Sequence, residues 1–140
     1  MTVAQKRPEF RNINAFTDLP KYRLPAPGLV SILHRISGVL MFVLMPLIIW
    51  MFDTSVSSEI SFARFRHAFE NGASGVLLKL FALALIWAYL HHFTAGVRHV
   101  WMDLNHKAVS KSWGNSSARF TLVFSLVLTV ILGAKLFGLY

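Results

Sequence analysis

The sequence contains no cysteine, and this absence excludes several kinds of site at once. Without a thiol, the chain cannot form a disulfide, an iron–sulfur cluster or a thiolate metal site of its own. Acidic residues are also scarce, with six Asp and Glu against fourteen Lys and Arg. Charged residues of both signs make up only 14% of the chain, compared with about 25% in typical soluble proteins. This composition is too apolar for an ordinary soluble domain.

Three long apolar runs account for this composition. Each has the roughly 20 residues that an α-helix needs to cross a hydrocarbon core of about 30 Å. The sequence therefore predicts an all-α membrane protein, part of a multi-subunit helical bundle, in which an N-terminal segment over 1–28 precedes a three-helix anchor over 29–140. The spans are expected at about 29–52, 76–101 and 119–139. Pro46 lies inside the first span and predicts a kink there.

Basic residues cluster at the ends of the apolar runs, which is typical of membrane anchors and argues against a nucleic-acid partner. The segment before the first run and the connection between the second and third runs carry most of these cations, whereas the connection over 53–75 is mixed in charge. By the positive-inside rule, we expect the N-terminus in the cytoplasm and the C-terminus in the periplasm of a bacterial inner membrane.

A polar face marks the start of the first span. Ser31, His34, Arg35 and Gly38 follow one another at helical spacing and share one face. One explanation is that Arg35 snorkels to the headgroups, because only about 9 Å of helix separates it from the start of the span. The other is that the face lines a cavity for an anionic or carbonyl-bearing ligand, since four consecutive polar or small positions suit a cavity better than lipid.

The second span carries a histidine with unusually small neighbours. Ala84, Ala88, His92 and Gly96 recur every four residues, so almost no side chain lies one turn from His92 on either side. Small residues allow close approach in membrane helices, and a flat cofactor has room here. His92 is therefore the candidate ligand of the span.

The other two histidines of this span have different surroundings. His91 follows Trp87 by one turn and is expected to point toward another helix, or toward lipid with a local hydrogen bond. His99 lies close to the cytoplasmic end and is interpreted as an interfacial histidine. Neither is expected to bind a cofactor.

The chemistry of the spans limits what His92 can hold. A structural zinc site needs four ligands, and a proton relay usually needs an intramembrane carboxylate, but the spans contain neither cysteine nor acid. Haem iron needs only one axial imidazole from this chain, because a partner can supply the other. A purely structural, hydrogen-bonding histidine is the alternative. His92 lies about 14 Å below the cytoplasmic boundary of the membrane, and Arg35 lies about 9 Å below it. The propionates of a haem bound at His92 could therefore reach His34 and Arg35.

Two motifs together carry a family resemblance. The first is Ser31-Ile32-Leu33-His34-Arg35-Ile36-Ser37-Gly38, and the second is His92-Phe93-Thr94-Ala95-Gly96-Val97-Arg98-His99, closed by Asp103. An N-terminal Arg7-Pro8 matches as well, and the three-span layout agrees over nearly the whole chain. At these residues the chain resembles the cytochrome b subunits of succinate dehydrogenase, the larger of the two membrane anchors of complex II.

The resemblance implies a haem site and a quinone site. In that family, the position of His92 is the axial ligand of haem b, and the smaller anchor subunit supplies the second axial histidine. His34 and Arg35 correspond to residues that contact the haem propionates, and Ser31 and Arg35 correspond to residues that line the ubiquinone pocket. A flavoprotein subunit and an iron–sulfur subunit dock on the cytoplasmic face. The resemblance thus predicts a subunit of succinate:quinone oxidoreductase, an enzyme of electron transport and the tricarboxylic acid cycle, with no catalytic activity of its own.

Two other functions stay open at this point. The first is the anchor of a quinol:fumarate reductase, in which electrons flow in the opposite direction through the same arrangement. The direction depends on the potentials of cofactors elsewhere. A haem-free structural membrane anchor is the second possibility.

Overall fold

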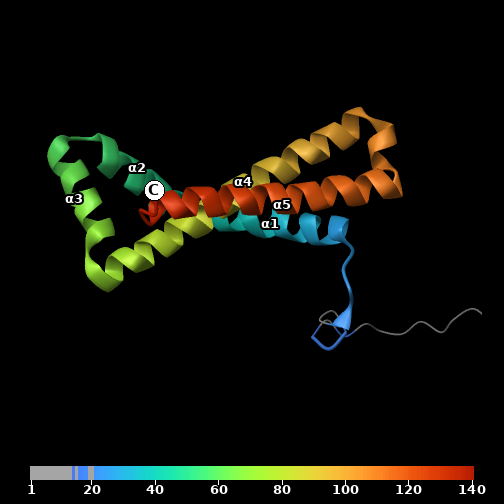
Figure 1. Cartoon of the computed structure of the whole chain (residues 1–140), viewed down its shortest axis with the longest axis horizontal. Helices are drawn as coiled ribbons and strands as arrows, with labels where there is room; N and C mark the ends of the chain where they lie inside the picture. The colour runs from blue at the N-terminus through green and yellow to red at the C-terminus, as the bar shows by residue number, and fades with distance from the viewer. Residues whose placement is uncertain (1–13, 15, 19–20) are drawn as a thin grey trace, which may run out of the picture.

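The computed structural model describes residues 14, 16–18 and 21–140, so the Arg7-Pro8 motif and most of the segment 1–28 lie outside the described residues. Within this part, the chain forms five α-helices and no β-strand. The helices are α1 (Ala26–Val43), α2 (Met45–Val56), α3 (Glu59–Glu70), α4 (Gly72–Leu104) and α5 (Lys111–Leu136), with a short 3-10 helix, η2 (His106–Val109), before α5 (Figure 1). Three of them, α1, α4 and α5, are long and apolar enough to cross a membrane. The predicted fold class, a three-span helical membrane protein, is confirmed.

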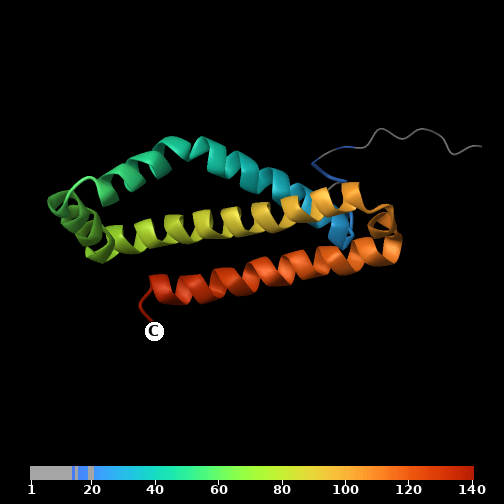
Figure 2. The same cartoon turned by 90° about the horizontal axis from the view of Figure 1, so that it is seen from above.

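The first apolar run is broken into α1 and α2 at Leu44. This residue has φ −89° and ψ 3°, outside the values of a regular helix. Pro46 follows in the first turn of α2, where its missing N–H leaves no hydrogen bond unmade. The ribbon bends at this point and arches away from α4 (Figure 2). The kink that Pro46 predicts is present.

The connection between α2 and α4 contains a helix that sequence analysis missed. Helix α3 begins with a capping box, in which the Ser61 N–H donates to Ser58 Oγ at 3.1 Å and the Ser58 N–H donates to Ser61 Oγ at 2.9 Å. It lies across the end of the bundle, between α2 and the start of α4 (Figure 1).

Small residues bring the three long helices together. Val30 of α1, Ala95 of α4 and Ala118 of α5 are fully buried against one another. Most large apolar side chains instead point outward, as they do in proteins surrounded by lipid or by partner helices. The small-residue contacts hold α4 between α1 and α5, and this position sets the directions of its histidines.

Candidate functional site

The structure brings His34 of α1 and His92 of α4 together. Their imidazole rings stack with centroids 4.1 Å apart and planes 25° apart. The ring of His99 lies 5.3 Å from His34 on the other side. The two polar groups that sequence analysis placed at similar depth therefore form one cluster, with His34 between His92 and His99.

Hydrogen bonding fixes one edge of the His92 ring. Nδ1 of His92 lies 3.0 Å from the main-chain oxygen of His34 and 3.3 Å from Oγ of Ser37. The buried Ser37 hydroxyl itself donates to the same His34 carbonyl at 2.9 Å. A carbonyl only accepts, so Nδ1 of His92 donates, and the neutral ring then carries its lone pair on Nε2. Metal-binding histidines have this arrangement, in which one ring nitrogen donates to a carbonyl and the other is free for the metal.

The absence of a side chain at Gly38 makes the close contact between α1 and α4 possible. A Cβ atom at Gly38 would lie 2.9 Å from Cε1 of His92, closer than real side chains approach. Gly96 is less restricted, because a Cβ atom there would lie 3.7 Å from Nε2 of His34, an ordinary contact distance. The expectation that Ala88 clears space for a cofactor beside His92 is wrong, because Ala88 is fully buried inside the bundle.

An apolar hollow of about 450 Å³ opens beside the half-buried ring of His92. It runs along one face of α4 toward Asn105, and its remaining lining residues are Phe93, Gly96, Val97, Val100, Trp101 and Leu104. Sites for flat cofactors are typically of this kind, mostly apolar with one or two polar groups that fix orientation.

His91 faces a different neighbour. Its side chain is fully buried, stacks on Trp87 at 5.6 Å, and its Nδ1 lies 3.2 Å from Oγ of Ser125 on α5. Nε2 of His91 is also buried and has no partner among the described residues. Because this nitrogen is enclosed within the bundle, a bulky cofactor has no access to it. Of the two directions expected for His91, toward another helix or toward lipid, the structure shows the first, and that helix is α5.

Ser31 and Arg35 lie on α1 near its first turns. Ser31 is half-buried, and the Arg35 side chain is exposed. Among the described residues, no hydrogen bond or ion pair holds the Arg35 guanidinium. Its donors are thus available to a group outside this chain.

Arg98 is a polar contact that sequence analysis did not assign. It is only 9% exposed, and its Nε donates to Oγ of Ser117 at 2.9 Å while Nη2 donates to the Gly114 carbonyl at 3.2 Å. These bonds join α4 to the first turns of α5. The seven-residue spacing from His91 was an available signal, because it places both residues on nearly the same face of α4.

Comparison with known proteins gives a consistent family. Residues 9–132 match the family described as the succinate dehydrogenase/fumarate reductase transmembrane subunit. This match covers most of the chain, including α1, α4 and nearly all of α5.

Several similar proteins carry the name succinate dehydrogenase cytochrome b556 subunit, among them the following three. The protein from Coxiella burnetii is 34% identical over 117 residues, which cover 83% of this chain and 90% of the relative. The protein from Paracoccus denitrificans is 27% identical over 113 residues, covering 81% and 83%. The protein from Rickettsia felis is 25% identical over 111 residues, covering 79% and 82%.

Proposed function

The chain belongs to the family of succinate dehydrogenase/fumarate reductase transmembrane subunits, and we propose that it supplies half of a haem b site and part of a ubiquinone site. His92 is the axial haem ligand contributed by this chain. A histidine of a second, smaller anchor subunit is the other axial ligand. The observation that carries the proposal is the hydrogen bond from His92 Nδ1 to the His34 carbonyl, which leaves Nε2 free beside an apolar hollow.

Two features of the chain fit this group. The hollow beside His92 is apolar, and no Asp or Glu lies between Ala73 and Met102 on α4 to repel the haem propionates. His34 and Arg35 stand at the cytoplasmic side of His92 and can donate charge-assisted hydrogen bonds to those propionates. When bound, haem b supplies a one-electron redox centre.

Ser31 and Arg35 are proposed to bind ubiquinone. The exposed Arg35 guanidinium has no partner among the described residues, and together with the nearby Ser31 hydroxyl it provides donors for the quinone oxygens, directly or through water. These donors bind the reduced, more negatively charged oxygen more strongly than the neutral carbonyl, so they favour electron transfer to the quinone.

The rest of the proposal concerns partners and direction. A flavoprotein subunit and an iron–sulfur subunit dock on the cytoplasmic face and deliver electrons from succinate, so this chain needs no catalytic centre of its own. The excess of cations on the N-terminal segment and on the α4–α5 connection supports a cytoplasmic N-terminus and a periplasmic C-terminus in a bacterial inner membrane. Succinate oxidation is favoured over fumarate reduction because the relatives compared above are all named succinate dehydrogenase subunits.

The haem assignment is tested on the purified complex by its reduced-minus-oxidised optical spectrum. We expect His92→Ala to abolish the b-type absorbance. His91→Asn is the matched control, since asparagine can still bond Ser125 and should retain the absorbance. Full absorbance in the His92 variant together with loss in the His91 variant would contradict the proposal, because it would identify His91 as the iron ligand.

The quinone assignment is tested by comparing two electron acceptors. Arg35→Ala should lower succinate:quinone reductase activity at least tenfold, the effect of losing about 1.4 kcal/mol of binding, while succinate-driven reduction of a water-soluble dye persists. Arg23→Ala, a change of another exposed arginine before α1, is the control. Equal losses with both acceptors would defeat the proposal, because they would place the defect in the catalytic subunits.

A further inference from the structure

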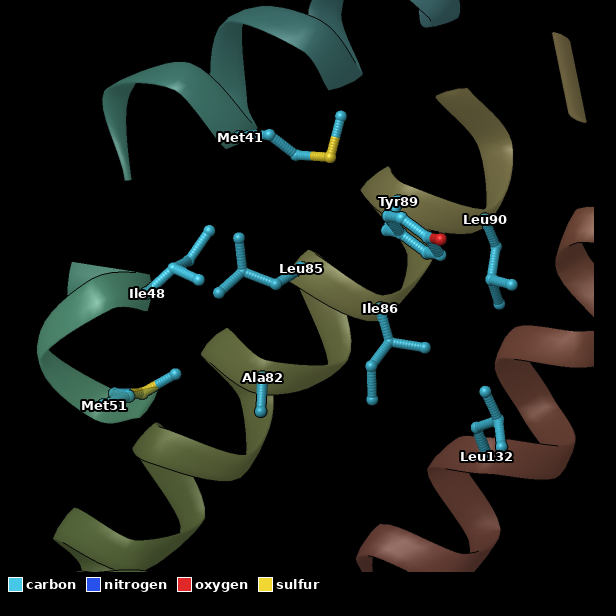
Figure 3. Close-up of a pocket in the computed structure, with 9 residues that line it drawn as sticks. All are labelled: Met41, Ile48, Met51, Ala82, Leu85, Ile86, Tyr89, Leu90 and Leu132. Carbon is cyan, nitrogen blue, oxygen red and sulfur yellow. The ribbon is translucent and has the colours of Figure 1, made fainter. Parts of the chain in front are cut away.

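A second hollow region lies along the N-terminal half of α4, and the histidine cluster lies further along the same helix. It consists of two adjoining hollows that share Met51 and Ala82. The inner one measures about 450 Å³ and is almost entirely apolar (Figure 3). Side chains from α1, α2, α4 and α5 border it: Met41, Ile48, Met51, Ala82, Leu85, Ile86, Tyr89, Leu90 and Leu132. The bend at Leu44 lies between Met41 and Ile48, so α1 and α2 border the inner hollow from the two sides of the kink.

The outer hollow has a different chemistry. It measures about 480 Å³ and lies where α3 meets α4 and the end of α5. Its lining combines three phenylalanines of α3 with three charged residues, Arg66, Glu70 and Lys79. We refer to the two hollows together as the Lys79 groove.

The charges of the outer hollow leave one cation without a counter-ion. Arg66 and Glu70 pair with each other at 2.9 Å, and this is the only ion pair within the described part of the chain. The Lys79 ammonium has no carboxylate partner there and lies 5.8 Å from the centroid of the Phe137 ring. The groove therefore has a net positive charge at its outer end, at a half-buried lysine.

The position of the groove along α4 matches one leaflet of a bilayer. Lys79 and Trp101 are 22 positions apart, about 33 Å of helix, which is close to the thickness of a hydrocarbon core. Lys79 thus lies at the headgroup boundary on the side where α4 begins. The inner hollow ends at Tyr89 and Leu90, about 15 Å further along the helix and near the bilayer midplane.

We propose that the Lys79 groove binds one membrane phospholipid, with its phosphate at the Lys79 ammonium and its acyl chains along the inner hollow. The cation matches the anionic phosphate, and the apolar part has the depth of a single leaflet. A partner helix fits less well, because it would cross both leaflets and would place an apolar surface against the ammonium. This site is separate from the proposed haem and quinone sites, which lie toward the other face of the membrane.

The proposal is tested by native mass spectrometry of the purified complex, stripped of lipid in detergent and supplied with phosphatidylglycerol. We expect one added phosphatidylglycerol per copy of this chain at the groove, and much weaker binding of a diacylglycerol with the same acyl chains. Lys79→Ala should weaken the phosphatidylglycerol binding about fivefold, as expected for one cation near an anionic headgroup, and Lys79→Arg should restore it. Lys135→Ala is the matched control, since this exposed lysine near the end of α5 borders neither hollow.

Two further measurements make the outcome decisive. Ala82→Leu should abolish binding, because a larger side chain fills the junction between the two hollows. A photoreactive benzoylphenylalanine in place of Ile86 should label phospholipid. Equal binding of both lipids, no effect of Lys79→Ala, or labelling of another subunit from position 86 would each overturn the proposal. The haem spectrum of the same samples should stay unchanged, which separates this result from the assignment of His92.

Discussion

Replacing Gly38 with alanine tests how the structure positions His92. The added Cβ atom would lie 2.9 Å from Cε1 and 3.3 Å from Nδ1 of the His92 ring. Carbon atoms in good contact are about 3.5–4.0 Å apart, so the ring has to move by at least about 0.6 Å. The bond from Nδ1 to the His34 carbonyl is 3.0 Å long, and a shift of this size removes or bends it.

Opposing terms determine the cost of Gly38→Ala. Alanine stabilises a helix interior by about 1 kcal/mol relative to glycine. Overpacking a tight contact costs about 1–3 kcal/mol, and loss of one hydrogen bond costs about 0.5–1.5 kcal/mol. The balance is a destabilisation of about 2 kcal/mol. The effect on haem is expected to be larger in relative terms, because loss of the bond that orients a metal-binding histidine typically lowers affinity by about 10–100-fold.

The assay is haem content per complex, measured from the b-type absorbance during titration of the haem-depleted complex with haem. Gly133→Ala is the steric control, since its Cβ would lie 2.8 Å from a methyl carbon of Leu83, far from the histidines. Gly114→Ala is the neutral control, because its Cβ would meet nothing within 4 Å. Wild-type haem affinity in Gly38→Ala would refute the reasoning. Equal loss in Gly38→Ala and Gly133→Ala would refute it as well, since general destabilisation would then be sufficient.

Two other changes test the polar contacts between α4 and α5. Arg98→Ala removes two hydrogen bonds made by a buried cation and should lower the free energy of unfolding by about 2 kcal/mol, as measured by thermal denaturation of the complex; Arg119→Ala, at an exposed position, should stay within about 0.5 kcal/mol of wild type. Ser125→Ala leaves Nδ1 of His91 buried without a partner and should cost about 1–3 kcal/mol, whereas Ser116→Ala on the exposed face should cost little. A control that lost as much stability as its buried counterpart would contradict the contacts in either case.

Length and hydropathy were sufficient to predict the three spans, because the thickness of a bilayer imposes nearly the same requirement on every spanning helix. The kink was predictable from Pro46, because a proline ring restricts the backbone and removes a hydrogen-bond donor wherever it occurs in a helix. Depth along a helix is also a local quantity, and it placed Arg35 within about 5 Å of the level of His92; in the structure the neighbouring residue, His34, stacks on the His92 ring. Helix α3 was missed because it is short, carries several charges, and depends on a serine capping box and on contacts with α2 and α4.

The direction of each side chain around its helix was harder to predict, because it depends on which neighbour packs where. The four-residue recurrence of Ala88, His92 and Gly96 fits both a cofactor site and a helix–helix contact. In the structure, Ala88 belongs to the contact and Gly96 faces His34. Gly38 is the residue that makes room for the His92 ring, and nothing in the sequence of α1 alone identifies the ring that it meets.

The adjacent histidines of α4 have different tasks because successive residues of a helix point about 100° apart. His91 faces α5 and bonds Ser125, whereas His92 faces α1 and bonds the His34 carbonyl. Each ring uses Nδ1 for a hydrogen bond between helices, so only Nε2 is left to bind a ligand. The accessibility of the two Nε2 atoms therefore determines which ring can do so. The Nε2 atom of His91 is enclosed by the bundle, and that of His92 belongs to a half-buried ring beside a hollow. That only one of the two histidines is a candidate ligand is therefore a consequence of packing three helices around two neighbouring imidazoles. Exchanging their surroundings would require α4 to rotate by about a quarter turn.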